Sequence, residues 1–82
     1  MKRSRDMILS QILDVCTNGG ACKTKIVYQS NLNFRTVTPY RELLTNNGMI
    51  NAITDSKQVL YETTIRGLAL LDNYRHIQDE LS

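Results

Sequence analysis

The sequence contains few of the side chains that build catalytic or metal sites. It has one histidine, two cysteines and no cluster of carboxylates. Cys16 and Cys22 flank a Gly-Gly pair and His76 lies far down the chain, so their spacing does not match a zinc site. So few groups cannot supply a nucleophile together with a base and a residue that orients it. We therefore expect no metal, no cofactor, no small-molecule ligand and no enzymatic activity.

Long apolar runs are also absent, and no stretch approaches the roughly 18 residues that a membrane-spanning helix needs. The basic N-terminus is followed by an amphipathic segment and not by the apolar core of a signal peptide. Apolar residues make up 41% of the chain and charged residues 22%, which is typical of a folded domain and not of a disordered one. We expect a cytoplasmic, nucleoid-associated protein without membrane contact.

Chain length limits the stability that one domain can reach. An 82-residue chain forms a single domain that buries only about 60–65% of the surface exposed by its unfolded chain. With no disulfide framework visible, dimerisation is the usual source of extra stability. Cys16 falls on the apolar side of a predicted helix and is expected to be buried, whereas Cys22 is expected to be exposed. An intracellular location disfavours a disulfide between them.

Charge is unevenly distributed along the chain. Residues 1–66 contain nine Lys or Arg against five Asp or Glu, and residues 67–82 contain one Arg against three acidic residues. The net charge of +2 is too small to prove a nucleic-acid partner. However, a basic head and an acidic tail are expected of a DNA-binding part with a separate assembly element. The alternative is a chance asymmetry in a small domain.

Two helices are predicted in the first half of the chain. Residues 4–17 carry a broad apolar stripe at helical spacing, with Ser4 as the N-cap and Asn18-Gly19-Gly20 as the stop. A short second helix is predicted from Lys25 to residue 29 or 30, with Thr24 as its cap. Together with the helix that follows, this is the two-helix unit of helix-turn-helix proteins.

A third helix is predicted over residues 33–47, with Asn33 as its cap and Gly48 just beyond its end. Pro39 lies beyond the first turn of this helix and removes one backbone hydrogen bond. Either Thr38 caps a helix that starts at Pro39 after a looser turn, or the helix is continuous and locally distorted. The helical spacing of the apolar residues favours the continuous helix.

A β-hairpin is predicted next. Two short strands, residues 51–54 and 58–63, flank the polar tip Asp55-Ser56-Lys57. Helix, turn, helix, glycine stop and hairpin together predict an α+β, mainly α fold. That fold is a winged helix-turn-helix, with a three-helix core, a β-hairpin wing and an additional C-terminal helix.

The last helix begins after Thr64, and a missing side chain at Gly67 suggests a close approach to the hairpin. Its apolar residues form a two-heptad seam of Leu70, Tyr74, Ile77 and Leu81. We expect this seam to be a homodimer interface; the alternative is that the helix packs back on its own domain. The chain then divides into a DNA-binding domain, residues 1–64, and a dimerisation helix, residues 65–82, within one folded unit.

Residues that match a known family run through most of the chain. They include Ile8-Leu9, Ile12-Leu13, Cys22-Lys23-Thr24-Lys25-Ile26-Val27-Tyr28, Ser30-Asn31-Leu32-Asn33-Phe34, Leu43-Leu44, Asn47-Gly48-Met49-Ile50, Tyr61, Thr64 and Gly67. On these residues the chain resembles the small archaeal winged-helix DNA-binding proteins and predicted transcription regulators that dimerise through a C-terminal helix. The resemblance implies a dimer, double-stranded DNA as partner and no enzymatic activity. Two features differ: Pro39 replaces a usually basic or polar residue, and the last helix is shorter than in some members.

Candidate DNA contacts follow from this interpretation. Phosphates are bound by Lys, Arg, hydroxyls and helix N-termini, whereas base edges are read from the major groove. The candidates are Lys23, Thr24 and Lys25 at the second helix, Asn33, Arg35, Thr36, Thr38 and Arg41 on the third, and Lys57 at the hairpin tip. Arg35 is the first candidate for base reading because Arg binds guanine through two hydrogen bonds. A phosphate contact is its alternative role.

The sequence thus predicts a double-stranded DNA-binding protein, a dimeric transcription regulator that inserts helix 33–47 into the major groove. The alternative is a winged helix used for protein–protein interaction, which predicts no salt-sensitive affinity for DNA. A non-specific chromatin-type binder is a variant of the first hypothesis, and the modest net charge argues against it.

Overall fold

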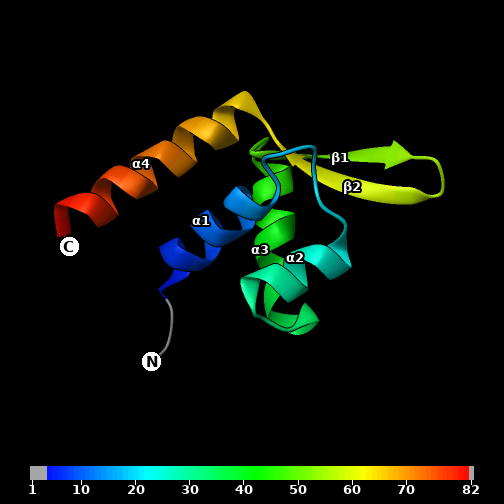
Figure 1. Cartoon of the computed structure of the whole chain (residues 1–82), viewed down its shortest axis with the longest axis horizontal. Coiled ribbons are helices and arrows are strands. Elements are labelled where there is room, and N and C mark those ends of the chain that lie inside the picture. The colour runs from blue at the N-terminus through cyan, green and yellow to red at the C-terminus, as the bar shows by residue number, and fades with distance from the viewer. Residues whose placement is uncertain (1–3, 82) are drawn as a thin grey trace.

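The structure, a computed structural model, describes residues 4–81, apart from the side chains of residues 78 and 81. Three helices are followed by a two-stranded antiparallel hairpin and a fourth helix (Figure 1). Their bounds are α1 (Arg5–Val15), α2 (Lys23–Ser30), α3 (Phe34–Asn46), β1 (Ile50–Asp55), β2 (Gln58–Thr63) and α4 (Ile65–Leu81). This arrangement confirms the predicted winged helix-turn-helix with an additional C-terminal helix.

Side-chain caps start two of the helices where the sequence predicted them. Ser4 Oγ accepts a hydrogen bond from the Met7 N–H at 3.1 Å at the start of α1. Asn33 Oδ1 accepts one from the Thr36 N–H at 2.8 Å at the start of α3. Each cap satisfies a backbone donor that has no partner within the helix.

The second helix starts two residues earlier than predicted, with Cys22 at the N-cap position and no side-chain hydrogen bond there. An isolated β-bridge explains this start. The Ala21 N–H donates to the Tyr61 carbonyl at 2.9 Å, and the Tyr61 N–H donates to the Ala21 carbonyl at 2.8 Å. Because this pairing keeps the chain extended up to Cys22, the helix begins directly after it. Thr24 therefore lies within the first turn, and its predicted role as the cap is wrong.

Pro39 lies inside a continuous helix, as the favoured alternative predicted. It has no N–H to donate to the Arg35 carbonyl one turn earlier. The proline ring is exposed, so this carbonyl lies on the solvent side of α3, where it can bond to water. Within the same turn the Thr38 hydroxyl donates to the Phe34 carbonyl at 2.7 Å.

The hairpin has the predicted position. β1 pairs with β2 from Ile50 opposite Thr63 to Asp55 opposite Gln58. The two residues between the strands make the turn, and Ser56 has a φ of 56°, the left-handed conformation that such tight turns use. β1 extends one residue beyond the predicted strand at each end, and β2 has the predicted bounds.

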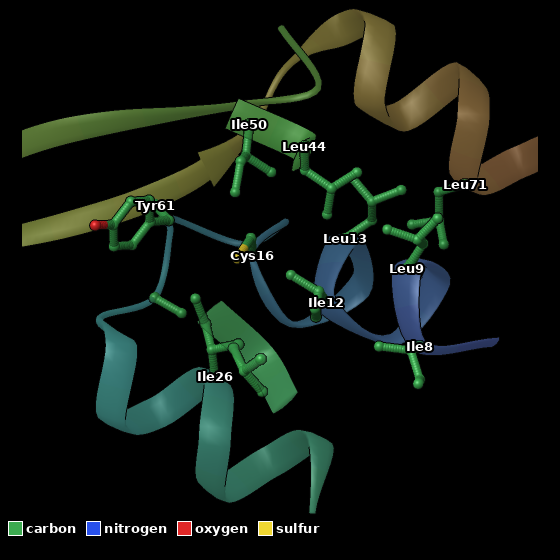
Figure 2. Close-up of a cluster of buried hydrophobic side chains, with 12 residues drawn as sticks. Ile8, Leu9, Ile12, Leu13, Cys16, Ile26, Leu44, Ile50, Tyr61 and Leu71 are labelled. Carbon is green, nitrogen blue, oxygen red and sulfur yellow. The ribbon is translucent and has the colours of Figure 1, made fainter. Parts of the chain in front are cut away.

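The hydrophobic core is centred on α1 and takes side chains from every helix and strand (Figure 2). Its buried members are Ile8, Leu9, Ile12, Leu13, Cys16, Ala21, Ile26, Val37, Leu44, Ile50, Tyr61 and Leu71. Burial raises the pKa of the Cys16 thiol to about 12. Both cysteines are free thiols, and Cys22 is half-buried, not exposed as predicted.

α4 packs back on its own domain from its start to Arg75. Leu71 is only 3% exposed and belongs to the core, and Arg75 forms an ion pair with Asp14 of α1 at 2.5 Å. A Cβ atom at Gly67 would lie against the Met49 carbonyl and 2.7 Å from Thr63 Cγ2, which confirms the predicted close approach. The alternative of packing on the domain is therefore correct for this part of the helix.

Candidate nucleic-acid interface

One side of α3 faces the core and the opposite side faces solvent. Val37, Arg41 and Leu44 are the buried residues of this helix. The exposed residues that follow one another at helical spacing on the opposite side are Arg35, Pro39, Glu42 and Asn46. We call these four residues the outward stripe of α3. An exposed, mostly polar helix side of this kind can enter the major groove of DNA.

The structure places the other predicted residues of α3 beside this stripe. Asn33 is exposed, but its Oδ1 is engaged in the helix cap, so its amide group is left to donate. Thr36 and Thr38 are half-buried. Because the Thr38 hydroxyl already donates to a backbone carbonyl, it can only accept a hydrogen bond from a ligand.

Arg41 lies on the opposite side of α3, and its predicted exposed position is wrong. The residue is 8% exposed, and its Nη1–H donates to the Tyr61 hydroxyl at 2.8 Å. Its guanidinium carbon lies 4.8 Å from the centroid of the same ring. Because Arg41 shares the side of Val37 and Leu44, its aliphatic part packs on the core while its charged end bonds to β2. Arg41 is therefore removed from the candidate DNA contacts.

The start of α2 offers a second positive surface. Lys23, Thr24 and Lys25 are all exposed there. Because no side chain caps α2, the N–H groups of its first turn are open to an anion, and the helix dipole adds to the two ammonium groups. In the view of Figure 1, α2 begins on the side of α3 toward which the hairpin extends.

Lys57 is exposed at the tip of the hairpin. The hairpin projects away from the helices in Figure 1, so its turn reaches beyond the helical body. This position agrees with the predicted place of Lys57 and leaves its ammonium group accessible.

Sequence reasoning missed two exposed residues of the outward stripe, Glu42 and Asn46. The signal that could have found them is their spacing, because they follow Arg35 by about two and three helical turns. Two aromatic residues, Tyr28 and Phe34, are also exposed, by 85% and 53%. Single exposed aromatic rings are common on protein surfaces and indicate no site by themselves.

The four residues of the predicted dimer seam divide into three groups. Leu70 and Tyr74 are half-buried and pack against the core of their own domain. Burial raises the pKa of the Tyr74 hydroxyl, and the negative charge of Asp6 raises it further. Ile77 is 53% exposed, and the side chain of Leu81 lies outside the described residues.

Within residues 4–81, no group of three or more His, Cys, Asp or Glu side chains could hold a metal ion. In the same part of the chain, no helix is long and apolar enough to cross a membrane.

One sequence relative and three solved structures show what the chain is similar to. An uncharacterized protein of Methanocaldococcus jannaschii is 37% identical over 49 residues, which are 60% of this chain and 50% of that protein. The matched segment thus spans half the length of this relative. The crystal structure of Sso10a-2, a DNA-binding protein from Sulfolobus solfataricus, has a TM-score of 0.78 and 25% identity, covering 96% of this chain and 85% of that chain.

Two further structures have the same fold at lower identity. The transcriptional regulator BldR from Sulfolobus solfataricus has a TM-score of 0.82 and 19% identity, and the match covers 90% of this chain and 55% of the BldR chain. A homodimeric winged helix-turn-helix DNA-binding domain from Mycobacterium bovis has a TM-score of 0.71 and 22% identity, and the match covers 89% of this chain and 68% of that domain's chain. Finally, the sequence profile described as winged helix-turn-helix matches residues 2–82. The chain therefore belongs to the winged helix-turn-helix family, and an archaeal protein is among its relatives.

Proposed function

We propose that this protein is a dimeric transcription regulator that binds double-stranded DNA with α3 in the major groove. The observation that carries the proposal is the outward stripe of α3, which no other element of the described chain covers. Arg35 extends from its N-terminal end, where a recognition helix contacts base edges. The buried Arg41 holds the opposite side of the helix to β2.

Phosphate contacts complete the proposed interface. Lys23 and Lys25 stand at the uncapped start of α2, and Thr24 adds a hydroxyl there. Asn33, Thr36 and Thr38 adjoin the outward stripe and can bond to the sugar–phosphate backbone on either side of the groove. Lys57 reaches the neighbouring backbone or the minor groove from the hairpin tip. Such contacts supply affinity and fix the orientation of α3, whereas the stripe supplies the sequence preference.

The dimer is proposed to form through the seam of α4, centred on the residue that its own domain leaves exposed. Only part of the predicted seam is covered by the domain itself, which leaves Ile77 as a large apolar side chain in water. Leu70, Tyr74 and Leu81 continue the same spacing on either side of it. In this arrangement residues 65–82 dimerise and residues 1–64 bind DNA. A two-fold dimer would present its two α3 helices to two half-sites about one DNA turn apart.

Methylation interference on end-labelled duplexes of a selected binding sequence tests the groove. Guanine N7 lies in the major groove and adenine N3 in the minor groove, so the two methylated positions report on different sides of DNA. We expect methylation of N7 at guanines of the site to prevent binding. Arg35→Ala should lose interference at one guanine and retain it elsewhere. Interference confined to adenine N3 would contradict major-groove insertion.

A protein-interaction module remains the second candidate because of an apolar surface beside the hairpin. Ile65 is 87% exposed, and Ile53 and Leu68 are 42% and 46% exposed. The three side chains line a groove of about 580 Å³ together with Glu62 and Arg66. If the protein has no salt-sensitive affinity for duplex DNA and Ile65→Asp abolishes capture of a partner, this second candidate is the correct one.

A further inference from the structure

The outward stripe of α3 carries one acidic side chain. Glu42 follows Arg35 by seven residues, which places it about two helical turns further along the same side. Its carboxylate is exposed, and no ion pair or hydrogen bond engages it within the described residues. Arg41, its neighbour in sequence, is directed to the other side of the helix and bonded to Tyr61.

This carboxylate has no evident role in the stability of α3. The residues three and four positions away on either side are Thr38, Pro39, Thr45 and Asn46. None of them is a cation that could pair with Glu42 along the helix surface. The carboxylate also opposes general attraction to DNA, because a negative charge close to the phosphates repels them. Glu42 therefore stabilises α3 through no ion pair along the helix, and it adds no non-specific affinity for DNA.

We propose that Glu42 determines sequence specificity by accepting a hydrogen bond from the exocyclic amine of a cytosine in the major groove. In that groove cytosine presents a donor at N4, and Glu is one of the side chains that accept from it. This inference rests on the proposed function and deepens it by naming a base. Arg35 binds the O6 and N7 acceptors of a guanine in the same groove. The negatively charged Glu42 thus accepts from a base that donates, and the positively charged Arg35 donates to a base that accepts.

The helix geometry sets the distance between the two bases. Seven residues of α-helix rise about 10 Å, and successive base pairs are about 3.4 Å apart along the DNA axis, so a helix that follows the groove separates the two side chains by at most about three base steps. The guanine and the cytosine should therefore stand within about three base pairs of each other in the preferred sequence. Pro39 lies between them and offers only apolar contact, for example to a thymine methyl group.

Selection from a library of random-sequence duplexes tests this inference, with four proteins compared: wild type, Glu42→Gln, Arg35→Ala and Glu80→Gln. Glutamine has the shape of glutamate but pairs with adenine. We expect Glu42→Gln to lose the cytosine by at least about fivefold and to prefer adenine at that position, with the guanine retained. Arg35→Ala should show the reverse pattern, losing the guanine and retaining the cytosine.

Glu80→Gln is the matched control because it removes the same charge from an exposed position near the end of α4. It should select the wild-type sequence. The inference is overturned if Glu42→Gln also selects the wild-type sequence, or if the wild-type protein binds duplexes without any base preference. A wild-type protein that retains no duplex at low salt would refute the proposed function itself, which is a different result from both. Circular dichroism spectra confirm that each variant is folded.

Discussion

Arg41 of α3 and Tyr61 of β2 are joined by a buried hydrogen bond of 2.8 Å. Within the described residues no carboxylate pairs with Arg41, so the tyrosine hydroxyl is the group that compensates the burial of its guanidinium. Tyr61 is also paired through its backbone with Ala21, immediately before α2. Tyr61 therefore connects three parts of the domain. They are α3, which is proposed to read bases, the hairpin, and the segment before α2, the helix that is proposed to contact phosphates.

Tyr61→Phe should destabilise the domain because it removes the acceptor of the Arg41 hydrogen bond and keeps the ring. A bond to a charged group of this kind contributes about 1.5–3 kcal/mol, and we expect a loss of that size in the free energy of unfolding. Urea denaturation followed by circular dichroism measures it. Tyr28→Phe is the control, because Tyr28 is 85% exposed and should unfold like the wild type. Equal stability of the two variants would contradict the account of Arg41.

Gly67→Ala should lower the free energy of unfolding by about 1–3 kcal/mol, as overpacking does in a close contact. The added methyl group would press on the Met49 carbonyl and on Thr63, and a backbone carbonyl cannot move aside as a flexible side chain does. Alanine is otherwise favoured over glycine in a helix, so a decrease in the free energy of unfolding would report the close contact and not helix propensity. In the control, Gly19→Ala, the methyl group enters open space and only the positive φ of 84° opposes it. A Gly67→Ala variant as stable as the wild type would disprove the close approach of α4.

Alkaline pH should destabilise the domain through Cys16. In the unfolded chain its thiol ionises near the ordinary value of 9.0, whereas burial keeps it protonated in the folded protein up to about 12. Between these values the unfolded state releases a proton that the folded state retains, so stability falls as pH rises, by about 1.4 kcal/mol per pH unit. Chemical denaturation across this range should show a smaller decline for Cys16→Ala than for the wild type. Parallel declines would show that Cys16 ionises equally in both states.

Ile77→Asp should convert the dimer to a monomer, because it places a charge at the centre of the proposed α4 interface. Size-exclusion chromatography with light scattering measures the molar mass. Ile65→Asp is the matched control on the first turn of the same helix, where the side chain is 87% exposed and outside the proposed seam. An unchanged mass for Ile77→Asp would exclude this interface. Dissociation by Ile65→Asp alone would place the interface beside the hairpin.

The features that local sequence determines were predictable. Ser4 and Asn33 cap helices through bonds to residues three positions away, and Gly48 follows the end of α3, so a few neighbouring residues suffice to recognise them. The start of α2 was missed because it depends on the bridge between Ala21 and Tyr61, forty residues apart in the chain.

The orientation of helices was harder to predict than their existence. Arg41 was expected at the DNA although its spacing from Val37 and Leu44 places it on the inner side of α3; the sequence does not reveal the partner in β2 that accepts its hydrogen bond. On α4, apolar residues are so frequent that the sequence does not specify which side meets the domain. In the structure Leu71 is the residue of α4 that is buried in the core, and it lies one position from the predicted seam residue Leu70. On α4, tertiary contacts decide among helix sides that are equally plausible from the sequence.

DNA binding itself is tested most directly by fluorescence anisotropy of a labelled duplex titrated with the protein at several salt concentrations. We expect the logarithm of the association constant to fall linearly with the logarithm of salt concentration, with a slope of about −0.9 for each phosphate contacted. Lys25→Ala should make the slope shallower by about 0.9, whereas Arg75→Ala, on α4 and paired with Asp14, should leave it unchanged. Binding that is absent at low salt, or that does not depend on salt, would contradict the proposal that this protein acts on DNA.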